Sequence, residues 1–196
     1  MIKFAKLLFA AGVLSFGLLG EPALADTPQD TLVIAKQIDD IITLDPAEVF
    51  EFSGGEVIAN VYDRIMTYEA EDTEKLVPGV AESHTVSSDG KTITLKIRPG
   101  QKFHSGNPLT AEDVAFSIQR VIILNKTPAF IFSQLGWTPE NVKDLVKAKD
   151  DLTVELTITE DFAPTFVLNC LSAGVGSVVD QKIVLDHQKD NDLGYE

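Results

Sequence analysis

The chain has 196 residues, a formal net charge of −14 and 44% hydrophobic residues. This acidity argues against nucleic-acid binding, which needs clustered basic residues to displace counterions from phosphate, and against binding to anionic membranes. Cys170 is the only cysteine, so an internal disulfide is impossible. A chain of this length can bury its own hydrophobic core, but it can also be part of something larger.

The first 25 residues have the order of a secretory signal peptide. Lys3 and Lys6 precede an apolar run over residues 7–19, and the small residues Ala23 and Ala25 follow. The alternative is a membrane anchor, but thirteen apolar residues are short for a bilayer, which needs roughly 20. We expect cleavage after Ala25, which changes the net charge from −14 to −15 by removing two lysines and one glutamate. No cysteine stands at this site, so a lipoprotein is not expected.

The residues after this segment predict one strand, one turn and one helix. Residues 31–38 alternate and contain several aliphatic side chains, which is typical of a strand. Pro46 ends any strand ladder there. Ser53 and Glu56 have the spacing of a capping box, and the apolar periodicity that follows predicts a helix over residues 57–66. Gly54 and Gly55 lie in no phosphate-binding motif, so we expect a tight turn.

Two hairpins and several short helices are predicted further along. Residues 91–98 alternate after an Asp-Gly turn at Asp89 and Gly90, so they pair with the segment that ends at Val86. Residues 142–149 and 152–158 form a second hairpin. Short helices are expected over residues 128–135, 162–171 and 180–189, and the glycine-containing segment 173–177 is expected to be a flexible crossing between lobes.

The segment 103–120 combines a turn with an amphipathic helix. Thr110 and Asp113 predict a helix cap, and Pro108 fixes how the preceding loop enters the helix. Apolar residues then recur at intervals of three and four, which leaves the polar side chains of Glu112, Gln119 and Arg120 largely outward. These features predict a packed helix and no chemistry.

The same segment resembles the signature of extracellular solute-binding proteins of the dipeptide and oligopeptide ABC-import family. The pattern F-x-x-G-x-P-x-x-A-x-D-V-x-F-S is matched by Phe103, Gly106, Pro108, Ala111, Asp113, Val114, Phe116 and Ser117. The similarity runs nearly without gaps over residues 76–120, and Asn60, Tyr62 and Asp63 match a second, more modest family pattern. We expect the signature residues to be structural.

The resemblance implies an α/β fold of the type II periplasmic-binding-protein class, of which only the N-terminal part is present. It implies that residues 26–48 and 170–196 belong to one lobe and that residues 49–169 form an inserted α+β subdomain. Residues 39–44 follow the first strand near the ligand cleft in this family. The candidate ligand-binding residues are therefore Asp39, Asp40, Ile41, Ile42 and Phe52.

The resemblance also implies a function without catalysis or cofactor. A peptide is captured between two lobes in the periplasm and delivered by a monomeric binding protein to an ABC permease in the inner membrane. The alternative solutes on the same scaffold are nickel, haem, sugars and opines, because a fold does not fix its ligand. Relatives are much longer, so we expect this chain to be a fragment or truncated product and to bind peptides poorly by itself.

Other functions are weighed on single residues. Ser88 and Lys91 fit a serine-hydrolase motif, but the Asp-Gly turn between them prevents the required helical geometry. Cys170 lies in an apolar run, which favours an inert thiol over a nucleophile in a small secreted hydrolase. The three histidines lack the spacing of a zinc site, and the segment 190–194 lacks that of a calcium loop. Asp39 and Asp40 point to opposite faces of an extended chain, so they are not expected to bind a cation together. No metal site is therefore expected. A self-contained adhesin or interaction module is the remaining alternative.

Overall fold

The structure is a computed structural model that describes residues 27–195, so the predicted signal peptide lies outside the described residues. The described chain divides into two units between Gln37 and Ile38. Residues 27–37 contain a turn and no helix or strand, so the strand predicted over residues 31–38 is wrong. A strand is stabilised by ladder hydrogen bonds, and this segment pairs with no strand in the described chain.

The second unit contains a four-stranded antiparallel sheet with the strand order β3-β4-β6-β5. The strands are β3 (Ala81–Val86), β4 (Thr92–Ile97), β6 (Thr153–Thr157) and β5 (Val146–Asp150). Val86 pairs with Ile93 across a turn in which Gly90 has φ of 74°, which confirms the predicted Asp-Gly hairpin. A separate two-stranded sheet joins β1 (Met66–Tyr68) to β2 (Leu76–Pro78).

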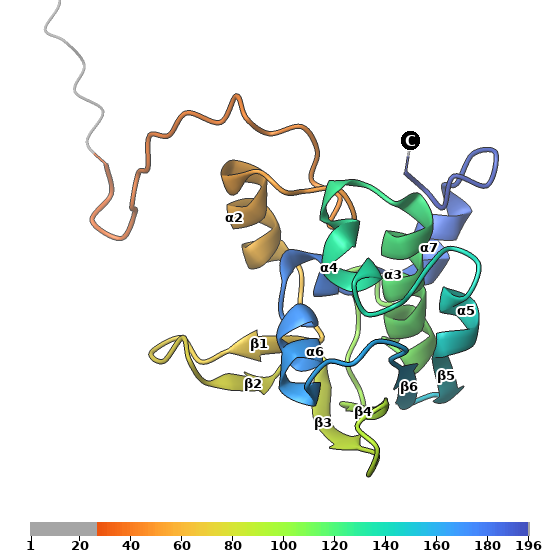
Figure 1. Ribbon diagram of the computed structural model, residues 1–196. Coiled ribbons are helices and arrows are strands. Elements are labelled where there is room, and N and C mark those ends of the chain that lie inside the picture. The colour runs from red at the N-terminus through yellow and green to blue at the C-terminus, as the bar shows by residue number, and fades with distance from the viewer. Residues whose placement is uncertain (1–26, 196) are drawn as a thin grey trace, which may run out of the picture. The chain divides into compact units, whose positions relative to one another are not determined.

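The helices gather on one side of this sheet, as Figure 1 shows. The longest is α3 (Ala111–Leu124), which contacts β5 and β6 as well as α7. The others are α2 (Phe52–Val61), α4 (Phe130–Ser133), α5 (Val142–Leu145), α6 (Pro164–Cys170) and α7 (Gln181–Asp186), with short 3-10 helices η2 (Thr127–Ala129) and η3 (Gly174–Gly176). Among the described residues, no helix is both long and apolar enough to cross a membrane.

One hydrophobic core joins these elements. Its largest fully buried side chains include Trp137, Phe132, Ile65 and Leu156. The Trp137 ring packs edge-on against Phe132 at 5.8 Å between centroids, and its Nε1–H donates to the carbonyl of Thr157 at 2.8 Å. The core also contains residues from both ends of the second unit, from Ala47 to Val178.

One predicted helix is confirmed in type but shifted, and part of one predicted strand is a helix. The helix expected over residues 57–66 is α2, which begins at Phe52 without a Ser53–Glu56 capping box and ends at Val61. The chain then becomes extended because its backbone pairs with a distant segment. Ile65 N–H donates to the Gly176 carbonyl, and Val178 N–H donates to the backbone carbonyl of Asp63. Residues 142–145, expected in a strand, instead form α5 before β5 begins.

The segment 173–177 is packed into a 3-10 helix and is not the flexible stretch that was predicted, while its role as a crossing between lobes stays a prediction. Gly174–Gly176 form the 3-10 helix η3, and Val175 and Gly176 are buried. A Cβ atom on Gly176 would lie 2.1 Å from the Leu171 carbonyl oxygen. Glycine is therefore needed here for close packing of two backbones, not for flexibility.

Candidate functional site

The five predicted ligand-binding residues lie in or beside the N-terminal end of α2. Two side chains tie the preceding turn to this helix: Asp40 Oδ2 accepts from Ser53 N–H at 3.1 Å, and Glu51 Oε1 accepts from Ile42 N–H at 2.9 Å. Phe52 is the first residue of α2. The structure therefore brings Asp40 and Ile42 close to the start of α2, with Asp39 and Ile41 adjacent to them along the chain. Whether these residues touch a ligand stays a prediction.

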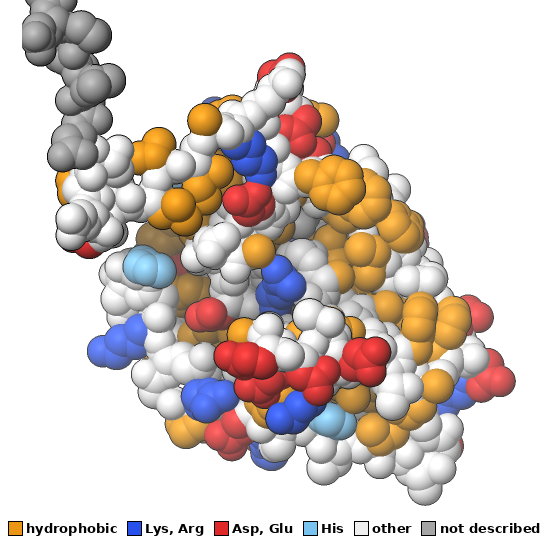
Figure 2. Space-filling model, turned by 90° about the vertical axis from the view of Figure 1, so that its left-hand side faces the viewer, with side chains coloured by type: hydrophobic (Ala, Val, Ile, Leu, Met, Phe, Trp, Pro, Cys, Tyr) orange, Lys and Arg blue, Asp and Glu red, His pale blue; other side chains and the backbone are white. Residues whose placement is uncertain are grey.

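Apolar side chains are unusually exposed around this helix. Phe52 is 96% exposed and Ile42 is 80% exposed. Other exposed apolar side chains of the same segments are Leu44, Phe50, Val57 and Val61. Figure 2 shows hydrophobic side chains gathered in patches on the side of the molecule where α2 lies. Exposed apolar side chains of this size are typical of a surface that binds a ligand or another part of a protein.

A pocket of about 270 Å³ lies beside α2, between this helix, η2, α4 and η3. Its walls are mostly apolar, and its charged side chains are Glu51 and Arg64. The Phe50 ring, which also lines the pocket, meets Phe130 edge-on at 5.6 Å between centroids. Ligand pockets typically have volumes of about 300–1,000 Å³, so a pocket at or below the lower end of this range suits only a small organic ligand.

Glu51, and not the predicted Ser53–Glu56 capping box, holds the start of α2 to the turn that precedes it. Its carboxylate accepts from the backbone N–H groups of Ile42 and Phe50, at 2.9 and 3.0 Å. These two hydrogen bonds hold the pKa of Glu51 below its ordinary value, because they stabilise the ionised form. The sequence offered no signal for this role, since the bond to Ile42 spans nine residues.

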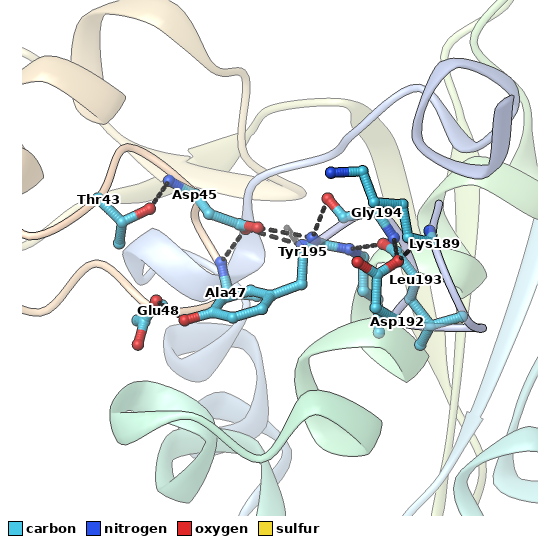
Figure 3. Close-up of polar contacts among 10 residues, drawn as sticks. Thr43, Asp45, Ala47, Glu48, Lys189, Asp192, Leu193, Gly194 and Tyr195 are labelled. Atoms are coloured by element: carbon cyan, nitrogen blue, oxygen red, sulfur yellow. Dashed lines mark hydrogen bonds and ion pairs between the residues drawn. The ribbon is translucent and has the colours of Figure 1, made fainter. Parts of the chain in front are cut away.

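A second network, drawn in Figure 3, fixes the turn that follows the predicted ligand-binding residues. Arg120 is 3% exposed and donates to both carboxylate oxygens of Asp45, at 2.7 and 2.6 Å. Arg120 Nε also donates to the Leu193 carbonyl at 2.8 Å. The prediction that Arg120 points outward is therefore wrong. Arg120 is buried because it pairs with Asp45, which lies 75 residues away in the sequence, and the periodicity of a helix does not reveal such a distant partner.

The same network holds the last described residues. Tyr195 O–H donates to Glu48, and Lys126 Nζ lies 3.8 Å above the centre of the Tyr195 ring. The carboxylate of Asp192 accepts from the N–H groups of Lys189 and Gly194 at 2.9 and 2.8 Å. Asp45 and Glu48 thus connect the turn before α2 to the segment after α7.

The signature residues hold α3 and the segment before α7 together. The Asp113 carboxylate accepts from Thr110 N–H at 2.9 Å and from Gln181 N–H at 3.1 Å, so it caps α3 as predicted and also binds a second segment. Ser117 Oγ accepts from Val179 N–H at 3.0 Å. Gly106 has φ of 87°, a conformation that favours glycine. These contacts support a structural part for the signature.

Phe103 lies at a further pocket of about 350 Å³ between the turn at residues 102–105 and α7. Asp180 lines this pocket, and its Oδ2 atom accepts from Ser105 Oγ at 2.6 Å and from Asn107 Nδ2 at 2.9 Å. The bonds that Asp180 makes here and to the N–H of Ile183 join the loop to α7. Asp180 therefore stabilises the contact between this loop and α7.

The residues considered for catalysis do not form an active site. Ser88 lies in the exposed turn between β3 and β4, where Asp89 accepts from Ser87 Oγ and from Lys91 N–H, so Ser88 and Lys91 do not share a helix. Cys170 is buried, and burial raises the pKa of its thiol, which disfavours the nucleophilic thiolate. Over residues 27–195, no group of three or more metal-ligating side chains comes together.

Comparison with known proteins identifies the fold and the family. The solved structure of Haemophilus influenzae OppA in complex with RPPGFSPFR superposes with a TM-score of 0.64 at 28% identity, covering 74% of this chain and 29% of OppA. The unliganded open form of MppA, a periplasmic murein tripeptide binding protein, also gives 0.64 at 24% identity, which shows a shared fold. The chain is part of a type II periplasmic-binding-protein fold, as the sequence predicted.

The amino-acid pattern described as bacterial extracellular solute-binding proteins, family 5, middle region, matches residues 75–194. The probable D,D-dipeptide-binding periplasmic protein DdpA of Escherichia coli K12 is 30% identical over 174 residues, which cover 87% of this chain and 32% of DdpA. The periplasmic oligopeptide-binding protein OppA of the same strain is also 30% identical, over 78% of this chain and 31% of OppA. The chain belongs to family 5 of the bacterial extracellular solute-binding proteins and spans about a third of the length of these relatives.

Proposed function

We propose that this chain forms one wall of the ligand cleft of a peptide-binding protein that serves an ABC importer. The observation that carries the proposal is the family match over residues 75–194, together with relatives named for binding dipeptides and oligopeptides. In this proposal the protein works in the periplasm as a monomer, after removal of residues 1–25, and passes its peptide to a permease in the inner membrane. It binds its solute and performs no covalent chemistry.

The surface around the start of α2 supplies the kinds of contact that a peptide needs. Asp39 and Asp40 are exposed carboxylates that complement a peptide ammonium group, while Ile41, Ile42 and Phe52 offer apolar contacts. Recognition through a few charges and apolar surfaces, combined with bonds to the peptide backbone, tolerates different side chains. This division between main-chain and side-chain contacts suits an importer of varied peptides.

A titration of the 15N-labelled chain with trialanine tests the proposal. We expect shifts of the amide resonances of residues 39–42 and 52, with weak affinity because one cleft wall is tested by itself. Phe52→Ala is expected to reduce these shifts. Phe162→Ala is the matched control, since Phe162 is another exposed phenylalanine but lies in the loop before α6.

The outcome distinguishes peptide binding from general stickiness. N-acetyl-trialanine amide keeps the three alanine side chains but has no terminal charges, so we expect it to shift these resonances less than trialanine. Absence of any saturable shift at residues 39–42 and 52, or equal effects of both compounds, would contradict the proposed site.

A further inference from the structure

The pocket beside α2 contains an arginine whose charge has no acidic partner among residues 27–195. Arg64 is half-buried, and its Nη1 donates to the Ser172 carbonyl at 3.0 Å. Its backbone is held on both sides, because its carbonyl accepts from Val80 N–H at 2.9 Å and it forms a β-bridge with Ser177. The side chain therefore starts from a fixed point in the fold.

Most N–H groups of this guanidinium bind no acceptor within the described part of the chain. A guanidinium has five N–H donors, and within the described part of the chain the Arg64 side chain makes one hydrogen bond and no ion pair. Glu51, the other charged side chain of the pocket, already accepts from the N–H groups of Ile42 and Phe50 with its two oxygens. An arginine in this setting favours an anionic ligand with which it can form charge-assisted hydrogen bonds.

The remaining walls define the rest of the ligand. Apolar side chains surround the pocket, namely Val49, Ile58, Pro128, Ile131 and Val175. The pocket has a volume of about 270 Å³, which leaves room for a short branched aliphatic chain. Among the residues that line the pocket, Arg64 is the one cation and Glu51 the one anion, so the pocket suits a ligand with a single negative charge placed at Arg64. A second negative charge on the ligand would have no cationic partner there.

We propose that this pocket binds a small monocarboxylate with a branched aliphatic chain, with its carboxylate on Arg64 and its chain against Ile58 and Val175. The inference does not depend on the proposed peptide function. A peptide on the exposed surface at Ile42 and Phe52 and a monocarboxylate in this pocket would shift different resonances, so either proposal can fail without the other.

The test compares 4-methylpentanoate with its neutral isostere 4-methylpentanamide in NMR titrations of the full chain at constant ionic strength. We expect the acid to bind at least tenfold more tightly than the amide and to shift the amide resonances of Gly55, Gly174 and Val175. Arg64→Met is expected to remove this preference by weakening acid binding about tenfold, which is about 1.4 kcal/mol. Equal binding of acid and amide to the unaltered chain would overturn the proposal.

Arg98→Met is the matched control for Arg64→Met. Arg98 also donates one side-chain hydrogen bond to a backbone carbonyl, that of Gly79 at 3.3 Å, but it does not line the pocket. We expect Arg98→Met to bind the acid as the unaltered chain does. A tenfold loss in this variant as well would show that only the overall charge matters and would overturn the site.

A pocket-filling variant keeps the test decisive if Arg64→Met does not fold. Gly55 lines the pocket, and a Cβ atom on it would meet no atom within 4 Å. Gly55→Leu should therefore occupy the pocket without disturbing α2 and weaken binding of both acid and amide at least tenfold. Undiminished binding to folded Gly55→Leu would place the ligand elsewhere.

Discussion

Arg120 is the residue on which the arrangement of the turn before α2 depends. Its guanidinium lies in the protein interior with Asp45, and the same side chain reaches the Leu193 carbonyl. Asp45 in turn accepts from Ala47 N–H at 2.9 Å, which fixes the turn that leads to α2. Removing one partner of a buried ion pair is costly because the other charge stays buried without compensation.

Arg120→Met should lower the free energy of unfolding by about 3–5 kcal/mol. Urea denaturation followed by circular dichroism measures this change. Asp45→Asn and the double variant complete a cycle, and the double variant should lose less than the sum of the two single changes. The exposed pair Lys182–Asp186 is the control, since Lys182→Met should have little effect. A change for Arg120→Met as small as this control would contradict a structural role.

The lowered pKa of Glu51 predicts how the stability of the protein depends on pH. Its pKa in the folded protein lies below the unfolded value of 4.5, so the stabilisation it provides is present above that value. This stabilisation is lost as the pH falls through the lower, folded pKa. Between about pH 6 and about pH 3, the unaltered chain should therefore lose more stability than Glu51→Gln.

Urea midpoints at the two pH values measure this difference. Glu56→Gln is the control, because Glu56 is an exposed carboxylate of the same helix that accepts from neither Ile42 nor Phe50. Parallel loss of stability in the Glu51→Gln variant and the unaltered chain would show that the amide bonds do not stabilise the carboxylate.

At the scale of elements, α2 is a short helix that is held by its neighbours more than by its own sequence. It contains two glycines near its start, which are poor helix formers, and its N-cap residue Glu51 makes no side-chain cap bond to the helix. Gly54 is buried against Val49, where a Cβ would lie 3.2 Å from a methyl group. A Cβ atom on Gly55 would meet no atom within 4 Å, so packing does not require a glycine at this position.

Gly55→Ala should therefore raise the free energy of unfolding by about 0.5–1 kcal/mol, through higher helix propensity. Gly176→Ala is the matched comparison, because a Cβ there would meet the Leu171 carbonyl at 2.1 Å, and it should destabilise the protein by about 1–3 kcal/mol. Thermal unfolding of both variants checks the two signs. Destabilisation by Gly55→Ala would show that α2 needs backbone freedom at this position.

At the scale of the whole molecule, the predicted insert and its flanks contribute to one core. Residues from the flanks, such as Ala47 and Val178, lie in the same hydrophobic cluster as Trp137 and Leu156. The division into residues 26–48, 49–169 and 170–196 stays a prediction, and the way the protein unfolds can test it.

We expect residues 49–169 and 170–178 to unfold in one transition. Trp137 is the only tryptophan and is fully buried, so its fluorescence reports on the predicted insert. Hydrogen exchange of the Val178 amide, which donates to the backbone carbonyl of Asp63, reports on residues 170–178. Coincident denaturation curves would show one cooperative unit. An earlier opening at Val178 would support a separate lobe.

The sequence by itself determined the elements whose hydrogen bonds and apolar contacts are local. The hairpin at Gly90, the capped helix that begins at Ala111 and the helix that begins at Pro164 depend on neighbours within a few residues, and all three are confirmed. The family also follows from one stretch, because its signature lies between residues 103 and 117. Local chemistry and motif spacing are enough for such features.

Only the tertiary structure decided what the charged and conformationally ambiguous residues do. Arg120 is buried because Asp45 lies beside it, Glu51 holds a turn nine residues away, and Gly176 is fixed by the Leu171 carbonyl. The pocket at Arg64 likewise combines residues from 49 to 175. Periodicity reports which face of a helix is apolar, but the pairing of distant charges and backbones depends on how the chain packs in three dimensions.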